Sequence, residues 1–181
     1  MLKMNKVKKA NIIVMFFFGS VIGWIWEVIC TFYRYGIFAN RGVLHGPWLP
    51  IYGVGFLLMI ILKKYVGKKP ILLFVSSLTV CGLLEFITSI VLETLYHTRW
   101  WCYGNEAFNI NGRVCLKSLI FFGVAGSLIV YGIVPVLDHE LNKIDAKKKK
   151  ILATMMMLIF MIDLVVSIFH PNMGSGISEG A

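Results

Sequence analysis

Charged residues are scarce in this sequence. Asp, Glu, Lys and Arg make up 15% of its 181 residues, whereas hydrophobic residues make up 58%. Soluble domains usually carry about 25% charged residues, so the composition excludes an ordinary soluble enzyme or binding domain. It predicts an all-α fold, a polytopic membrane helix bundle of about five transmembrane helices.

Sequence motifs for metal and nucleotide chemistry are also missing. The four histidines are not spaced as zinc ligands. The basic turn at residues 67–69 lacks the preceding glycine spacing of a Walker A phosphate loop. We therefore expect no metal site and no cofactor, and no ATP hydrolysis by that route.

Cysteine is limited to four residues. Cys102 and Cys115 share one predicted connection, where a disulfide is one alternative and free thiols the other. Cys30 and Cys81 are better explained as small apolar side chains inside helices.

Long hydrophobic runs dominate what is present. Five segments alternate with polar connections, at residues 11–33, 48–62, 70–95, 117–137 and 150–169. They predict a single transmembrane domain over residues 1–171. Residues 172–181 are rich in Gly and Ser and are expected to form a disordered tail.

The basic residues are distributed unevenly between the two sides of these segments. The N-terminal tail holds four, residues 63–69 hold four and residues 143–150 hold five, which gives 13, whereas the other connections hold 5. The positive-inside rule then predicts a multi-pass protein of the cell membrane, with a cytoplasmic N-terminus and a C-terminus outside. This distribution also explains the net charge of +9 without nucleic acid as a partner.

The first outer connection contains the most unusual stretch of the chain. Residues 40–53 read NRGVLHGPWLPIYG and combine three glycines and two prolines with Arg41 and His45. Glycine and proline allow bends and close backbone approaches that a plain helix does not need. The following apolar segment has only about 15 residues, which is short for a span. We therefore predict a structured outer loop or re-entrant segment that lines a site.

Four acids lie within or at the ends of apolar segments: Glu27, Glu85, Glu93 and Asp163. A charge in the bilayer costs at least about 2.5–3.5 kcal/mol, so such acids normally face a bundle interior or a wet cavity. For Glu27 and Glu85 we favour a functional role, and for Glu93 and Asp163 structural pairing. All four are expected in the outer half of the bundle.

The second outer connection, residues 98–116, is predicted to be an ordered loop with Trp100, Trp101 and Tyr103 at headgroup level. Arg99 and Arg113 there could bind a phosphate or carboxylate, or pair with Glu93 or Glu106. The candidate polar, substrate-binding cavity therefore comprises Glu27, Asn40, Arg41, His45, Glu85, Glu93, Arg99, Trp100 and Arg113.

Several motifs together resemble a known family. They are GWxxE at Gly23–Glu27, NRGxLxGPxLPIYG at residues 40–53, LEFxTSxxxE at residues 84–93, RWWxY at residues 99–103 and FNxNGRVCL at residues 108–116. This order is similar to that of the bacterial family called putative ABC-transporter type IV, or CmpB-type permeases. Where the family usually has WWDYS, this chain has Cys102 in place of the acid, which puts any role of that acid in doubt.

The resemblance implies a membrane permease that has no ATPase of its own, is not an enzyme and works with a separate ATPase subunit. Five spans make a thin pathway, so a homo-oligomer is also implied, in addition to the lipid bilayer as a partner. The alternative is a membrane-embedded enzyme or a lipid- or peptide-binding protein with an outward-facing polar site. In that case Glu27 or Glu85 would act as the general base. A small partner protein without chemistry of its own is a third hypothesis.

Overall fold

The computed structural model describes residues 9–174 and residue 177, and their regular structure is helical. The helices are α1 (Lys9–Tyr35), α2 (Pro50–Val66), α3 (Pro70–Tyr96), α4 (Leu116–Leu128), the π-helical segment η1 (Ile129–Ile133), α5 (Val134–Lys143) and α6 (Ala146–Phe169). Because α4, η1 and α5 are continuous, they form one long helix. Together with α1, α2, α3 and α6, it gives five helical bodies. The predicted five-helix bundle is confirmed.

Four of these helical bodies are long and apolar enough to cross a membrane: α1, α3, the α4–η1–α5 helix and α6. Helix α2 has 17 residues, or about 25 Å at 1.5 Å per residue. The expected short second segment is therefore present, although it extends four residues beyond its predicted end. Helix α6 begins at Ala146, four residues before its predicted start.

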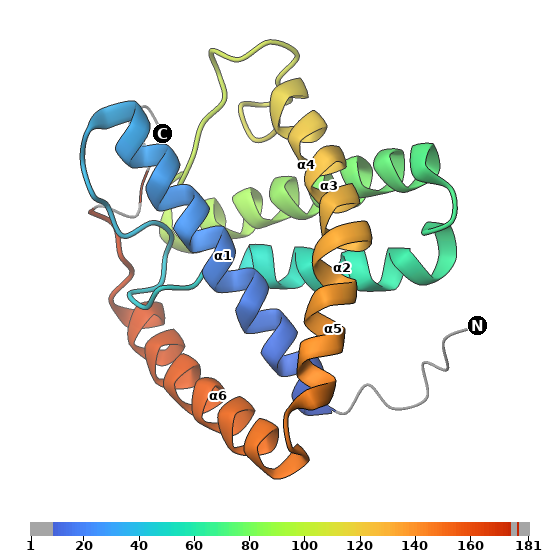
Figure 1. The fold of residues 1–181 in the computed structure, drawn as a ribbon. Coiled ribbons are helices and arrows are strands. Elements are labelled where there is room, and N and C mark those ends of the chain that lie inside the picture. The colour runs from blue at the N-terminus through green and yellow to red at the C-terminus, as the bar shows by residue number, and fades with distance from the viewer. Residues whose placement is uncertain (1–8, 175–176, 178–181) are drawn as a thin grey trace.

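The bundle has two ends that differ in what they carry. The start of α1, the α2–α3 turn and the α5–α6 turn lie toward one end (Figure 1). The α1–α2 connection, the α3–α4 connection and the end of α6 lie toward the other. We call the second the loop end, since it carries both connections that the sequence predicted to be structured.

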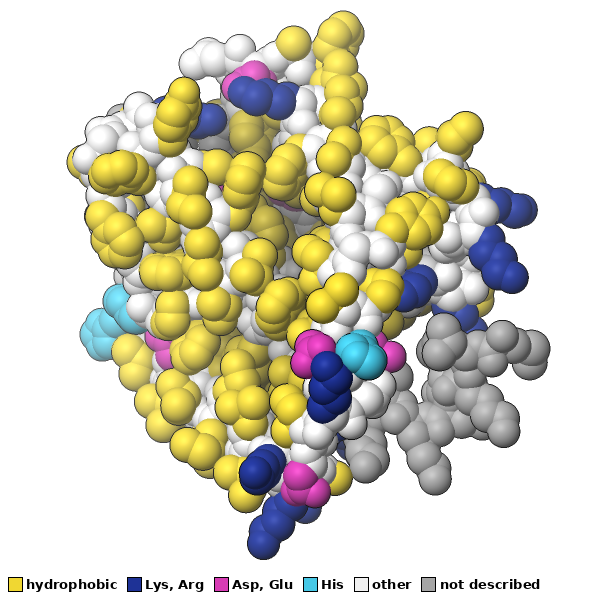
Figure 2. Space-filling view, viewed as in Figure 1, with side chains coloured by type: hydrophobic (Ala, Val, Ile, Leu, Met, Phe, Trp, Pro, Cys, Tyr) yellow, Lys and Arg dark blue, Asp and Glu magenta, His cyan; other side chains and the backbone are white. Residues whose placement is uncertain are grey.

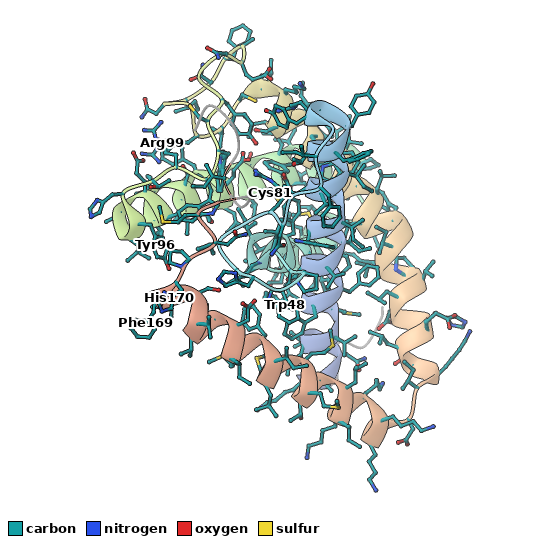
Figure 3. The ribbon with its side chains drawn as sticks, turned by 90° about the vertical axis from the view of Figure 1, so that its left-hand side faces the viewer. Trp48, Cys81, Tyr96, Arg99, Phe169 and His170 are labelled. Atoms are coloured by element: carbon teal, nitrogen blue, oxygen red, sulfur yellow. The ribbon has the colours of Figure 1, made fainter. Side chains whose placement is uncertain are left out.

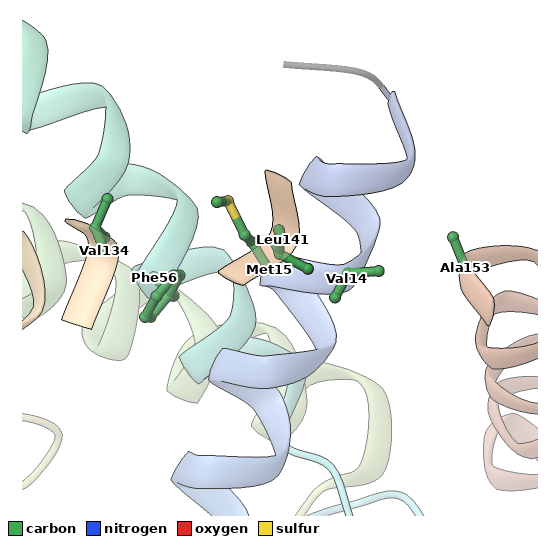
Figure 4. Packing of buried hydrophobic residues seen from close by; sticks show 6 residues of the cluster. All are labelled: Val14, Met15, Phe56, Val134, Leu141 and Ala153. Carbon is green, nitrogen blue, oxygen red and sulfur yellow. The ribbon is translucent and has the colours of Figure 1, made fainter. Parts of the chain in front are cut away.

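A hydrophobic cluster near the first end ties four helical bodies together. Val14 and Met15 of α1 pack with Phe56 of α2, and the same cluster includes Leu141 of α5 and Ala153 of α6 (Figure 4). In lipid such packing is stabilised by van der Waals contact rather than by exclusion of water. This cluster positions the start of α1 against α2, α5 and α6.

Small residues allow α1 and α2 to approach closely. A Cβ added to Gly23 would lie 2.1 Å from the Tyr52 ring, and one added to Gly19 would lie 2.6 Å from Phe56 Cβ. Glycine at these two positions lets the aromatic side chains of α2 rest directly on the α1 backbone. Gly19, Gly23 and Glu27, spaced four residues apart, therefore lie on the face of α1 that meets α2.

The α4–η1–α5 helix contains the π-helical segment η1, which ends two residues before Pro135. Pro135 has no N–H to donate and its ring crowds the carbonyl of the preceding turn. The helix responds by widening, and the N–H of Val134 bonds to the carbonyl of Ile129 five residues back. The span thus continues through Pro135 to Lys143, past its predicted end at residue 137.

Candidate functional site

The α1–α2 connection turns back into the bundle. Its last residue before α2, Leu49, donates its backbone N–H to the carbonyl of Ser20, at 3.0 Å. Ser20 lies 15 residues, or about 22 Å, before the end of α1. Leu44 and Trp48 are only 2% and 8% exposed and share a cluster with Phe17. These contacts fold residues 36–49 back against α1, and we call these residues the re-entrant segment. The sequence predicted a structured outer loop or a re-entrant segment at residues 40–53, and the short helix α2 follows it.

Asp163 of α6 holds this re-entrant segment. Its carboxylate accepts the backbone N–H groups of His45, at 3.1 Å, and Gly46, at 2.9 Å, and the indole N–H of Trp48, at 2.6 Å. Trp48 lies between α1 and α6, with its ring edge-on to Phe160 (Figure 3). We call this arrangement the Asp163 clamp. It shows how an acid in an apolar helix is stabilised, with a loop backbone as its partner.

Asn40 and Asn172 complete the loop from opposite ends of the chain. Asn40 accepts the indole N–H of Trp24, at 2.7 Å, and donates to the His45 carbonyl, at 2.7 Å. The side-chain amide of Asn172 donates to the Asn40 carbonyl, at 2.8 Å, and its backbone N–H donates to Val43. Asn172 was predicted to begin the disordered tail, most of which lies outside the described residues.

Gly42 is the position in this segment where glycine is required. Its φ of +91° lies in a region that side chains rarely adopt, and a Cβ there would lie 2.2 Å from Leu49 Cδ2. The adjacent Arg41 is 7% exposed, so the loop carries a buried guanidinium. His45 is exposed, and its Nε2 lies 2.8 Å from the carbonyl oxygen of His170.

The two acids favoured as functional are both bonded to phenols. Tyr52 of α2 donates to Glu27 of α1, at 2.5 Å. Tyr103 of the α3–α4 connection donates to Glu85 of α3, at 2.9 Å, and Ser118 of α4 donates to the other oxygen of that carboxylate, at 3.2 Å. Glu85 is 7% exposed. We call these five residues the carboxyl–phenol cluster.

The two halves of this cluster act on one another electrostatically. Burial, followed by the charge of Glu85 and the hydrogen bond to it, holds the pKa of Tyr103 well above its usual value, and the charge of Glu27 adds to this effect. Tyr103 therefore stays a hydrogen-bond donor at physiological pH. Each residue of the cluster comes from a different part of the chain: α1, α2, α3, the α3–α4 connection and α4.

A separate ion-pair group orders the α3–α4 connection. Glu93 pairs with Arg99, at 3.1 Å, and with Arg113, at 2.5 Å. Arg113 also donates to Ser89, at 2.9 Å, and Arg99 donates to the carbonyl of Asn111, at 3.1 Å. Of the two alternatives left open for these arginines, the structure shows pairing with Glu93. Both guanidinium groups are thereby committed to holding the loop.

Two aromatic residues of this connection lie elsewhere than predicted. Trp100 is 3% exposed and rests edge-on against Tyr96 of α3, at 5.3 Å, so it is a buried packing residue and not a headgroup anchor. Tyr103 points to Glu85 because a carboxylate in an apolar setting offers its hydroxyl a strong acceptor. Cys102 and Cys115 are free thiols.

The structure distributes the candidate residues over three hydrogen-bonded groups: the Asp163 clamp with its loop, the carboxyl–phenol cluster and the ion-pair group of Glu93. Two surface depressions are lined by residues 69–75 and by residues between Glu106 and Ile120, and neither lining includes Glu27, Glu85 or Arg41. A single polar cavity that joins the candidate residues stays a prediction. Among the described residues, no three His, Cys, Asp or Glu side chains converge as metal ligands would.

The model of the family described as "Putative ABC-transporter type IV" matches residues 14–168, from the first turns of α1 to the end of α6. The chain belongs to this family. No curated protein and no solved structure matches it significantly.

The family match covers all three hydrogen-bonded groups of the loop end. It also covers most of the residues in these groups that were not predicted from the sequence as site residues. Tyr52 lies in the PIYG motif and Tyr103 in the RWWxY motif, so both were visible as motif residues. Ser118 and Asn172 carried no signal of their own. Asp163 was recognised as an intramembrane acid, but its partners lie more than 100 residues away in the sequence.

Proposed function

We propose that this protein is the membrane-spanning permease subunit of an ABC transporter and that the carboxyl–phenol cluster lies on its substrate route. The observation that carries the proposal is that Glu27 and Glu85, on two different membrane helices, each accept a tyrosine hydroxyl, and that the charge of Glu27 also acts on Tyr103. Ionisable residues inside a membrane bundle normally mark substrate or ion pathways. The family and the four apolar helical bodies long enough to cross a membrane support this role.

The two cluster acids differ from the other acids of the bundle in their partners. Glu93 has two arginines, and Asp163 has three N–H donors of one loop. Among the described residues, Glu27 and Glu85 have neutral hydroxyl partners and no ion pair. Hydroxyl groups can rotate toward a new partner, whereas the arginine pairs fix two separate chain segments. The cluster acids are therefore the ones available to a ligand.

We further propose that the N-terminus is cytoplasmic and the C-terminus outside the cell membrane. The turns with most basic residues lie toward one end of the bundle, and both structured connections lie toward the other. The end of α6 joins the loop end through Asn172. Four helical bodies are long enough to cross a membrane, and the proposal counts the shorter α2 as the fifth crossing. The positive-inside rule then gives opposite sides for the two termini.

ATP hydrolysis would be supplied by a separate subunit at the basic end. The α5–α6 corner there is braced, because Asp145 accepts the backbone N–H groups of Lys147 and Lys148 at the start of α6. The ammonium group of Lys149 is buried and donates to the carbonyl of Leu141, at 2.8 Å. A braced corner can pass a force from a docked ATPase into α5 and α6. A second copy of the chain would complete the pathway.

Co-purification tests this proposal. The protein is extracted in a mild detergent from its own host, and bound proteins are identified and assayed for ATP hydrolysis. We expect a stoichiometric ATPase whose activity depends on the membrane subunit. Reproducible absence of any ATPase, with the bundle still folded, would remove the coupling mechanism.

The role of the cluster is tested on the recovered complex. Glu27→Gln and Glu85→Gln should leave the amount of complex unchanged and reduce its coupled activity at least about tenfold. Glu106→Gln is the matched control, since Glu106 pairs with the exposed Lys117 and belongs neither to the cluster nor to the α5–α6 corner. If both cluster variants only lower protein abundance, the acids are structural.

One observation favours a second candidate, a membrane-embedded enzyme or a lipid- or peptide-binding protein. Ser118 Oγ lies 3.2 Å from the Glu85 carboxylate, and an acid beside a hydroxyl can activate it as a nucleophile. Covalent labelling by a serine-reactive phosphonate separates the two candidates. An enzyme should be labelled at Ser118, and Ser118→Ala should abolish the labelling, whereas a permease should not be labelled there.

A further inference from the structure

The α2–α3 turn concentrates positive charge without any compensating acid. Residues 63–69 contain four lysines, and no Asp or Glu occurs between residues 28 and 84. No ion pair within the described part of the chain involves these lysines. We call residues 63–69 the α2–α3 basic turn. Its charge is therefore available to an outside partner.

An apolar depression adjoins this turn on the exposed surface of α3. It has a volume of about 440 Å³ and is lined by Lys69, Pro70, Ile71, Leu72 and Val75. Ile71, Leu72 and Val75 are all exposed, so the first turn and a half of α3 presents aliphatic surface beside the ammonium groups. Figure 2 shows the lysines at the right edge of the molecule next to hydrophobic side chains.

The α5–α6 corner, residues 143–150, carries five lysines, one more than the α2–α3 basic turn, but they have different surroundings. Lys143 pairs with Glu140, and Lys149 turns inward onto the Leu141 carbonyl. Asp145 also lies in this corner. The two basic turns therefore differ in acid content. In Figure 1 they also lie apart, with the α5–α6 turn at the bottom and the α2–α3 turn at the right-hand edge.

From this combination we propose that the α2–α3 basic turn and the depression beside it form a binding site for an anionic phospholipid. The headgroup phosphate accepts hydrogen bonds from Lys68 and Lys69, and an acyl chain lies along Ile71, Leu72 and Val75. Charge complementarity selects this occupant, because anionic lipids concentrate where basic residues flank membrane helices. The apolar wall selects a lipid over a soluble phosphate.

Lipid retention on the purified full-length protein tests the proposal. The protein is delipidated in detergent and titrated with phosphatidylglycerol or phosphatidylcholine of identical acyl chains, and bound lipid is counted by native mass spectrometry. We expect phosphatidylglycerol to bind more tightly. The double variant Lys68→Gln/Lys69→Gln should weaken phosphatidylglycerol binding at least about fivefold, with phosphatidylcholine binding unchanged.

The matched control removes the same charge from the other turn. Lys147→Gln/Lys148→Gln should weaken phosphatidylglycerol binding less than about twofold. Equal losses in the two double variants would overturn the proposal and indicate a diffuse surface charge effect. So would equal affinity of the native protein for both lipids. Thermal unfolding in lipid-free detergent confirms that each variant is folded before its lipid binding is interpreted.

The apolar part of the site is tested by its own substitution and a competitor. Leu72→Asn should weaken phosphatidylglycerol binding, whereas glycerophosphate, which has the headgroup phosphate but no acyl chain, should compete poorly. Effective competition by glycerophosphate would show a soluble-phosphate site instead. None of these outcomes depends on an ATPase partner, so the lipid site and the permease proposal can fail separately.

Discussion

Asp163→Ala is the substitution whose consequence follows most directly from the structure. The carboxylate joins α6 to the re-entrant segment through three donors, the N–H groups of His45, Gly46 and Trp48. Its removal leaves the Gly46 and Trp48 groups without an acceptor in a partly buried site. The His45 N–H is exposed and can turn to water. We therefore expect the segment to loosen from α6 before the bundle unfolds.

The size of the effect can be worked from these bonds. Hydrogen bonds to charged groups contribute about 1.5–3 kcal/mol each in soluble proteins, but measured values within membranes average nearer about 0.6 kcal/mol. Two partly buried bonds between these limits give a loss of about 2–4 kcal/mol. For a chain of this length, each kcal/mol lowers the melting temperature by about 2–4 °C. The expected decrease is roughly 5–15 °C.

The native cysteines provide the assay. Four free thiols, one of them buried at Cys115, become reactive toward a maleimide dye as the detergent-solubilised protein unfolds. Asp163→Asn should lower the melting temperature by less than Asp163→Ala, because one oxygen acceptor remains. Ser167→Ala is the control: its hydroxyl donates to Asp163, at 3.2 Å, but does not touch the loop. It should cost less than about 1 kcal/mol.

Hydrogen exchange locates the change within the chain. The amides of residues 45 and 46 should exchange faster in Asp163→Ala than in Ser167→Ala, while those of α3 stay protected. The reasoning would be refuted if Asp163→Ala melted within about 1 °C of Ser167→Ala. Equal exchange at residues 45 and 46 in both variants would refute it as well.

Two further substitutions address the other groups. Gly23→Ala should destabilise the protein by about 1–3 kcal/mol, since its Cβ would lie 2.1 Å from the Tyr52 ring; Gly132→Ala, with nothing within 4 Å, should be neutral or stabilising in the same melting assay. Arg113→Gln should lower the melting temperature and increase proteolysis of the α3–α4 connection. Lys117→Gln, which removes an exposed pair at 3.5 Å, should change neither.

The acids of this bundle can be sorted by whether their partner is fixed. Asp163 and Glu93 each hold a connection to a helix, through loop N–H groups or through arginines. Among the described residues, Glu27 and Glu85 accept side-chain hydrogen bonds only from hydroxyl groups. An intramembrane acid is therefore evidence for a ligand route only after its partners are known. The depth of an acid alone does not distinguish these roles.

The sequence by itself determined the helical membrane architecture, the short second helix and the presence of an ordered connection at residues 40–53. These follow from local properties, because bilayer thickness sets the length of a span and glycine and proline set where it is interrupted. Sequence also determined the family, through motifs that lie close together along the chain. The choice of Glu27 and Glu85 over Glu93 as candidates came from the same intramembrane-charge rule.

Only the tertiary structure decided which partner each polar residue has. Asp163 and His45 are 118 residues apart, and Glu85 and Ser118 are 33 apart, so no local pattern couples them. An unpaired polar group in an apolar setting costs several kcal/mol, and each such group therefore takes whichever donor the helix packing brings within reach. That packing places the residues of the one predicted cavity in three groups: the Asp163 clamp, the carboxyl–phenol cluster and the ion-pair group.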